Sequence, residues 1–164
     1  MGSIKVFIYS SGDINCFLRL GNDVIFVNAA GQGGYSIDNA VSYLNEHANE
    51  RSVHLFGKYV GLALQAGGIK GAMADGKNYG PILVKNGFHV VNTKGYSPMK
   101  GDVTVVDGNA SHKWGHVQMY NGDQWVSDFF QGWCSTKPGY EYGGKGFMVY
   151  SKNIPSLTIY RIGN

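Results

Sequence analysis

The chain has 164 residues, of which 43% are hydrophobic, and a formal net charge of +3 at neutral pH. This length allows one domain with a proper core and is too short for two of ordinary size, so we expect a single domain over residues 1–164. The Lys and Arg residues are scattered along the sequence, which gives no local support for a nucleic-acid-binding surface.

Several other classes of protein and site are disfavoured by simple patterns. No apolar run reaches the roughly 18 residues of a membrane span. Residues 1–20 lack the basic-then-apolar layout of a signal peptide. The two cysteines, Cys16 and Cys134, are too few for a disulfide framework, and their spacing matches no zinc pattern. We therefore expect a soluble chain without a classical export signal and without a metal.

The N-terminal segment contains short apolar runs bounded by turn-forming residues. Ile4–Tyr9 and Val24–Val27 are two such runs, and the apolar residues from Cys16 to Leu20 lie between them. They predict two or three strands, arranged as a meander. Residues 1–35 are thus interpreted as an N-terminal β extension, and residues 36–164 as the core of the domain.

A helix is expected next, from Ser36 or Asp38 to about Asn49. Ser and Asp side chains accept hydrogen bonds from the unpaired N–H groups at a helix start. Apolar residues recur along this stretch at the spacing of one helix face. His47, near its end, is interpreted as a solvated helix residue.

The stretch from Ser52 to Gly68 predicts a second helix. Its apolar residues recur every three or four positions, Ser52 can cap its start, and Gly67 with Gly68 provides a stop. The first turn carries Phe56. This turn matters because unpaired N–H donors and the positive end of the helix dipole lower the pKa of a thiol or bind an anion.

Shorter elements follow. Tyr79–Lys85 is expected to be a helix, because Pro81 fits its first turn. Phe88–Val91 is interpreted as a brief strand or as apolar packing. A turn around Gly101 then leads into a strand at Val103–Val106.

Two neighbouring strands are predicted at Trp114–Tyr120 and Trp125–Phe130. The short connection between them has hairpin chemistry, so we expect them to be adjacent and antiparallel. His116 lies in the first strand and Asp128 in the second. A carboxylate beside an imidazole can fix its tautomer and keep it basic.

Closing strands are expected at Phe147–Tyr150 and Leu157–Ile162. Between them and Asp128 lie aromatic residues, including Trp133 and Tyr140, that could line a groove for a sugar or a peptide. Packing in the core or at its rim is the alternative interpretation.

These features resemble the CHAP and NlpC kinds of cysteine amidases and endopeptidases of bacterial cell walls. Many members read Ser-x-Gly-x-Cys-Ala-x-Tyr-Val and then Ala-Leu-x-Ala-Gly-Gly. The matching residues here are Ser52, Tyr59, Val60, Ala63, Leu64, Ala66, Gly67 and Gly68. Three positions depart from the pattern: His54 replaces Gly, Phe56 replaces the nucleophilic Cys, and Gly57 replaces Ala.

Further motifs extend the resemblance over roughly residues 36–150. Pro98–Val103 is similar to the Pro-x-x-Gly-Asp-Val lead into the first strand of the catalytic sheet. Gly115–Val117 takes the place of the Gly-His-Val opening that carries the catalytic His. Asp128–Gln131 reads Asp-Phe-x-Gln, again as in the family.

The resemblance implies an α+β fold with a papain-like, NlpC-like core, in which helices pack on an antiparallel sheet. In an active member, a thiolate at the helix start attacks an amide carbonyl and a His accepts and returns the proton. Here the catalytic positions are Phe56, His116 and Asp128, with Asp128 orienting His116. The substrate-binding candidates are Ser52, His54, Trp114, Trp133 and Tyr140. The chemistry implied uses no metal and no organic cofactor.

Phe56 has no lone pair or acidic proton, so three interpretations stay open. The first is a wall-degrading toxin inactivated by a change of Cys to Phe. The second is a natural pseudoenzyme that binds wall peptide or a protein. The third is a displaced thiol, from Cys16 or Cys134, although buried or loop thiols are the simpler interpretation of both. A metal site made by His54, His116 and Asp128 is supported neither by spacing nor by the resemblance.

The resemblance also implies partners and a destination. The substrate would be the stem peptides of peptidoglycan, and a cognate immunity protein would fill the groove of an effector. Small amidases of this kind without export signals are often type VI secretion effectors or phage lysis proteins. The chain would then be made in the cytoplasm and delivered to the periplasm and cell wall of the target cell.

Overall fold

The computed structural model describes residues 16–20, 23–27, 34–110, 112–131 and 156–163. The contacts between residues divide the chain into two compact units, Met1–Tyr35 and Ser36–Asn164. This boundary falls where the sequence analysis separates the β extension from the core. That both units form one domain stays a prediction.

The first unit contains a two-stranded antiparallel sheet of β1 (Cys16–Leu20) and β2 (Asp23–Val27). Cys16 pairs with Val27 and Leu20 with Asp23, so the two strands form a tight hairpin. The strand expected at Val24–Val27 is thereby confirmed. The run Ile4–Tyr9 lies outside the described residues.

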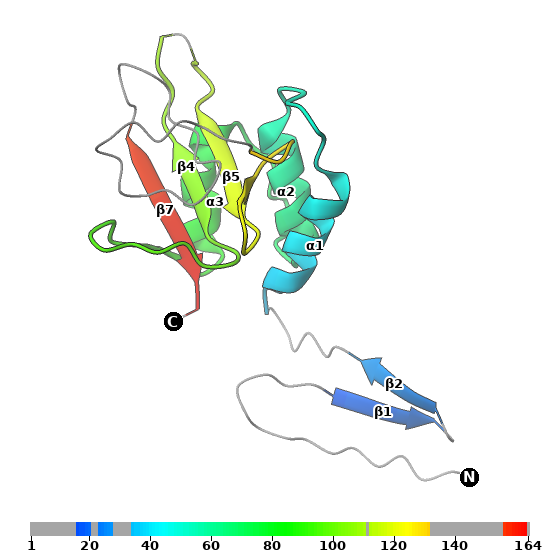
Figure 1. Cartoon of the computed structure of the whole chain (residues 1–164). Helices are drawn as coiled ribbons and strands as arrows, with labels where there is room; N and C mark the ends of the chain where they lie inside the picture. Colours follow the sequence, from blue (N-terminus) through cyan, green and yellow to red (C-terminus); the bar gives the residue numbers. More distant parts are fainter. Residues whose placement is uncertain (1–15, 21–22, 28–33, 111, 132–155, 164) are drawn as a thin grey trace. The chain divides into compact units, whose positions relative to one another are not determined.

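The second unit combines helices with a five-stranded antiparallel sheet, in the order β3-β7-β4-β5-β6. Its helices are α1 (Ile37–His47), α2 (Phe56–Ala66) and α3 (Tyr79–Lys85), with one 3-10 turn, η1 (Gly76–Asn78). Its strands are β3 (Phe88–Val90), β4 (Val103–Val106), β5 (His116–Tyr120), β6 (Trp125–Val126) and β7 (Leu157–Ile162). In Figure 1, α1 and α2 lie side by side, and α2 packs on β5. The predicted α+β class, with helices packed on an antiparallel sheet, is confirmed.

Most boundaries agree with the sequence analysis. Ser36 caps α1, because its Oγ accepts a hydrogen bond from the Asn39 N–H at 3.2 Å. The helix α3 and the strands β4 and β7 have the predicted bounds, and the brief strand at Phe88 is β3.

The predicted strand Trp125–Phe130 is wrong at its far end, since β6 stops at Val126. The chain turns back there: Ser127 N donates to Phe129 O at 3.0 Å, and Phe130 forms a bridge to Val126. Phe129 also pairs with Asn49, which follows α1. This turn carries Asp128 out of the sheet and toward the segment that precedes α2.

Glycines let α2 approach the loop that follows it. A Cβ atom on Gly57 would lie 2.4 Å from Ala74 O, and one on Gly61 would lie 2.2 Å from Ala72 O. The two glycines are one helical turn apart, so they form a groove that the loop backbone fills. Tyr79 completes the contact by donating its hydroxyl to Gly57 O at 2.5 Å. The first turn of α2 is therefore fixed by backbone contacts.

The start of β5 is fixed in a similar way. Gly115 has a φ of +65°, and a Cβ there would lie 2.2 Å from Val106 O. A Cβ on Gly76, in η1, would lie 2.7 Å from the His116 carbonyl carbon. Because η1 presses directly on the His116 backbone, this residue has little freedom to move.

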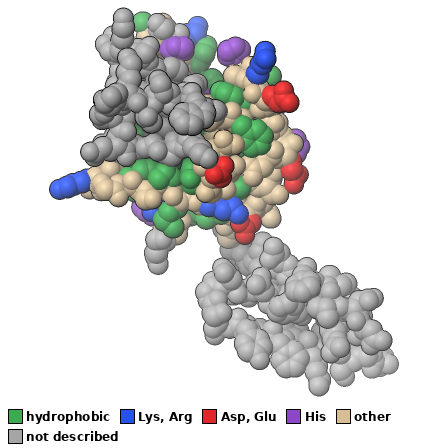
Figure 2. Space-filling model, in the orientation of Figure 1, with side chains coloured by type: hydrophobic (Ala, Val, Ile, Leu, Met, Phe, Trp, Pro, Cys, Tyr) green, Lys and Arg blue, Asp and Glu red, His purple; other side chains and the backbone are tan. Residues whose placement is uncertain are grey.

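The surface of the described part includes an exposed ion pair, in which Lys100 Nζ lies 2.5 Å from Asp38 Oδ1. Figure 2 shows basic and acidic side chains of the described part spread over the visible face, with blue and red groups next to each other in places. None of the helices in the described part of the chain has the length and apolar character that a membrane span requires.

Candidate active site

Phe56 is the first residue of α2, so the prediction that it lies in the first turn of a helix is confirmed. The helix begins later than expected, with Leu55 at the N-cap position and no side-chain cap. Ser52, predicted as the cap, is used differently. Its Oγ donates to Asp128 Oδ2 at 3.0 Å and accepts from His54 N at 3.1 Å.

Asp128 holds the segment before α2 in place. Its Oδ2 accepts from Val53 N at 2.7 Å and from Leu55 N at 3.2 Å, in addition to the Ser52 hydroxyl. Its Oδ1 accepts from Ser127 Oγ at 3.0 Å. The carboxylate is fully buried. A buried charge is stable only when hydrogen-bonded, and these donors satisfy it while orienting the chain that leads to Phe56.

The segment is tied to Asp128 through the backbone as well. Asn49 donates its N–H and its side-chain amide to Asp128 O at 2.9 and 2.7 Å. Residues that are 79 positions apart in the sequence are joined in this way. The start of α2 and the end of β6 therefore move as one piece.

His116 faces Phe56. The centroids of their rings are 4.8 Å apart and the ring planes are inclined by 57°. His116 is 1% exposed, and Phe56 is partly exposed. The structure thus brings together two of the three predicted catalytic positions, Phe56 and His116.

Gln131 contacts the imidazole of His116, with the Nε2 of Gln131 3.1 Å from the Nε2 of His116. The prediction was that Asp128 orients His116. The Asp128 contacts described above go instead to the segment before α2 and to Ser127, and Asp128 as the orienting group stays a prediction. Sequence reasoning missed Gln131, although the Asp-Phe-x-Gln motif contained it.

Burial lowers the pKa of His116 to about 4, against opposing contributions from the Asp128 charge and the Gln118 amide. The imidazole is therefore neutral at neutral pH. A neutral imidazole can accept a proton from a neighbouring thiol, and Phe56 has none to give.

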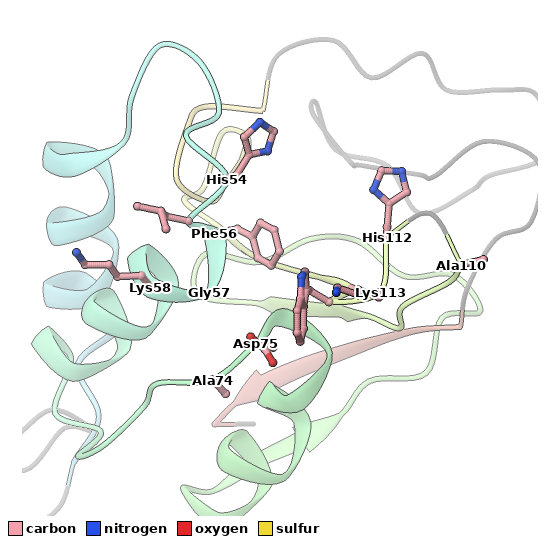
Figure 3. Close-up of a pocket in the computed structure, with 12 residues that line it drawn as sticks. His54, Phe56, Gly57, Lys58, Ala74, Asp75, Ala110, His112 and Lys113 are labelled. Atoms are coloured by element: carbon pink, nitrogen blue, oxygen red, sulfur yellow. The ribbon is translucent and has the colours of Figure 1, made fainter.

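A pocket of about 650 Å³ opens beside these residues. Its lining includes His54 and Phe56 on one side and His112, Lys113 and Trp114 on the other (Figure 3). The Lys113 ammonium lies 4.6 Å from the centre of the Trp114 ring, a cation–π contact. In Figure 3 the Phe56 ring points between His54 and His112. The pocket thus has aromatic and cationic walls with Phe56 in its lining.

The predicted substrate-binding residues fall into three groups. His54 and Trp114 line the pocket. Ser52 belongs to the network around Asp128 and does not line it. Trp133 and Tyr140 lie outside the described residues, as does Cys134.

His54 has a feature that the sequence suggested only indirectly. Its φ is +60°, in the left-handed region that glycine favours. The family pattern places Gly at this position. The backbone here has kept a conformation suited to Gly while carrying a histidine.

No group of three or more His, Cys, Asp or Glu side chains is placed to hold a metal ion within the described part of the chain. The Asp128 carboxylate that would have joined such a site is occupied by the donors given above.

Comparison with known proteins gives one clear relationship. No protein-family model and no curated protein sequence matches the chain. Among solved structures, it matches a chain of the native type VI effector–immunity complex Tae3–Tai3 from Ralstonia pickettii, with a TM-score of 0.63 and 32% identity. The match covers 79% of this chain and 100% of the other. A selenomethionine form of the same complex gives a TM-score of 0.57 and 33% identity over 76% and 100% of the two chains.

The matched neighbour is the effector, so the papain-like, NlpC-type fold expected from the sequence is confirmed. Identity of this level over the whole of the neighbour exceeds a likeness of fold alone. The chain belongs to the family of the type VI secretion effector Tae3.

Proposed function

We propose that this chain is a peptidoglycan amidase-like antibacterial effector of the CHAP/NlpC cysteine-peptidase kind, in a form that lacks its nucleophile. The observation that carries the proposal is the tilted contact between the rings of Phe56, at the start of α2, and His116, whose centroids are 4.8 Å apart. A thiol at position 56 would lie at a helix N-terminus beside a neutral imidazole, the two conditions that activate it. Phe56 removes the reacting atom and leaves the surroundings.

The catalytic positions in this proposal are Phe56, His116 and Asp128, and His54 and Trp114 contact the substrate from the walls of the pocket. The substrate is the stem peptide of peptidoglycan, and the bond cut by an active form is an amide. Membership of the Tae3 family supports delivery by type VI secretion to a target cell, with the periplasm as the destination. The crystallised relative forms an effector–immunity complex, which supports a cognate immunity protein for this chain as well.

Restoring the thiol tests the proposal. The Phe56→Cys variant and the given chain are incubated with purified sacculi, and the released fragments are identified by mass spectrometry. We expect the variant to release peptide fragments and the given chain to release none. Phe56→Ala is the matched control, because it removes the ring without supplying a thiol. A Phe56→Cys/His116→Ala variant should again be inactive.

Two other outcomes would contradict the proposal as stated. If the given chain cuts sacculi and loses this activity on Cys134→Ala or Cys16→Ala, a displaced thiol performs the reaction. If neither chain cuts but the given chain binds wall fragments, the protein is a pseudoenzyme that acts as a binding module. The pocket favours this second function, since it stays open with Phe56 in its lining.

A further inference from the structure

Four buried side chains form a continuous hydrogen-bonded chain that ends on His116. Ser127 Oγ lies 3.0 Å from Asp128 Oδ1, Gln131 Nε2 lies 2.7 Å from Ser127 Oγ, and the same Nε2 lies 3.1 Å from His116 Nε2. None of the four residues is more than 1% exposed. Because bulk water cannot replace these partners, each hydrogen must be placed by the chain itself.

The carboxylate at one end decides the direction of every bond. Ionised Asp128 can only accept, so Ser127 donates its single hydroxyl hydrogen to it. Ser127 Oγ can then only accept from Gln131, so the amide turns its NH₂ group toward Ser127. The second hydrogen of that NH₂ group points at His116 Nε2, which must accept it. A ring nitrogen that accepts carries no hydrogen, so the hydrogen of the neutral ring lies on Nδ1.

We infer that Gln131 positions His116 through Nε2, and that it holds the neutral imidazole in the Nδ1–H tautomer. Asp128 acts on the ring through Ser127 and Gln131, and its other oxygen orients the segment before α2. Whether His116 can act as a base toward position 56 matters only if the proposed function holds. The tautomer itself does not depend on that function.

An amide suits this place because it can also accept. Nε2 contacts Gln131, so a thiol at position 56 would give its proton to Nδ1 while the electron pair stays on sulfur. Nδ1 can take that proton only when the hydrogen of the neutral ring is on Nε2, and Nε2–H then needs an acceptor. A half-turn of the amide supplies Oε1, which has no hydrogen-bond partner among the described residues. The half-turn breaks the Gln131–Ser127 hydrogen bond unless the Ser127 hydroxyl also turns from Asp128 to Oε1. The orientation of the Gln131 side-chain amide thus decides whether His116 Nδ1 can accept a proton from a thiol at position 56.

The tautomer can be measured in the given chain. Full-length protein labelled with ¹⁵N-histidine is examined by NMR at neutral pH, and the His116 signals are assigned with the His116→Gln variant. We expect a protonated-type ¹⁵N shift at Nδ1 and an unprotonated-type shift at Nε2. The reverse pattern would overturn the inference without any variant.

Substitution of Gln131 sharpens the test. A carboxylate cannot donate, so Gln131→Glu should move the hydrogen to Nε2. Gln124→Glu, in the turn between β5 and β6, adds the same charge outside the network and should leave the ring unchanged. If Gln131→Glu does not fold, Gln131→Met removes the donor at similar volume, and a signal for Nε2–H should appear. An unchanged Nδ1–H pattern in the folded variant would contradict a positioning role.

Activity separates this inference from the proposed function. In the Phe56→Cys background, Gln131→Met should lower kcat by at least about tenfold with KM nearly unchanged. Met offers no acceptor to the Nε2–H of the ring, so the form of His116 that accepts the thiol proton is neither held in place nor stabilised once it is charged. An unchanged kcat would contradict the role of Gln131 in catalysis. If Phe56→Cys is itself inactive, the proposed function fails, and the tautomer measured in the given chain still decides the inference.

Discussion

The helix side and the sheet side of the site differ in how closely their residues follow the amidase pattern. The helix side, from His54 to Gly57, departs from the amidase pattern at three positions, including the nucleophile. The sheet side keeps His116 and a buried polar network that reaches it from Asp128. The difference teaches that the geometry of this site does not depend on the thiol. It is held by one carboxylate and its hydrogen-bond donors, and none of these hydrogen bonds involves Phe56.

The Asp128→Ala substitution should have the largest effect on this arrangement. It leaves the N–H groups of Val53 and Leu55 and the hydroxyls of Ser52 and Ser127 without their acceptor. We expect the free energy of unfolding to fall by about 4 kcal/mol, because one buried and three part-buried donors lose a charged acceptor and a hydrogen bond to a charged group contributes about 1.5–3 kcal/mol. Urea denaturation would measure this. Asp123→Ala, at an exposed turn, is the control and should change stability little.

If Asp128→Ala changed the free energy of unfolding only slightly, the comparison between the two sides would be wrong, because contacts other than this carboxylate would then hold the helix side. A large effect with unchanged α2 protection in hydrogen exchange would place the loss in the sheet instead.

Acidification should lower the stability of the fold through His116, on the sheet side of the site. Burial lowers the pKa of folded His116 to about 4, while an unfolded His titrates at 6.5. Between these values the unfolded state binds a proton that the folded state does not, so the free energy of unfolding falls as the pH falls from 6.5 to 4. The loss is on the order of 3 kcal/mol. Denaturation curves for the chain and for His116→Gln, measured over this range, give the contribution by difference.

The exposed His112 provides the control for this pH dependence. In His112→Gln, the free energy of unfolding should fall on acidification as much as in the given chain. In His116→Gln, this fall should be smaller by about 3 kcal/mol. Equal pH dependence in the two variants would mean that His116 is not held neutral by burial.

The smallest effect is expected at His54, on the helix side. Its φ of +60° is costly for a residue with a Cβ atom, and glycine removes that cost. Because glycine also makes the unfolded chain more flexible, we expect His54→Gly to raise the free energy of unfolding by only about 0.5 kcal/mol. Thermal or urea unfolding would measure it. His112→Gly is the matched control and should lower stability, and a loss at both positions would show that His54 is not strained.

Much of the fold could be predicted from the sequence because it follows from local patterns. Pro81 predicted α3, the turn around Gly101 predicted β4, and Ser36 marked the start of α1; the bounds expected for α3, β4 and β7 are those of the structure. The same kind of reasoning failed at Ser52, because a serine before an apolar run can cap a helix or serve a distant carboxylate. Nothing within a few residues of Ser52 distinguishes the two cases.

The sequence by itself determined the α+β class, the pairing of the two strands around Gly122, and the absence of a nucleophile at position 56, since each depends on residue type or on short-range periodicity. Only the tertiary structure decided that β6 ends at Val126 and that Asp128 binds the segment before α2. It alone showed that Gln131 touches His116. The physical reason is that buried polar groups must find partners wherever the fold places them, and such a partner can lie 79 residues away along the chain, as Asn49 does from Asp128.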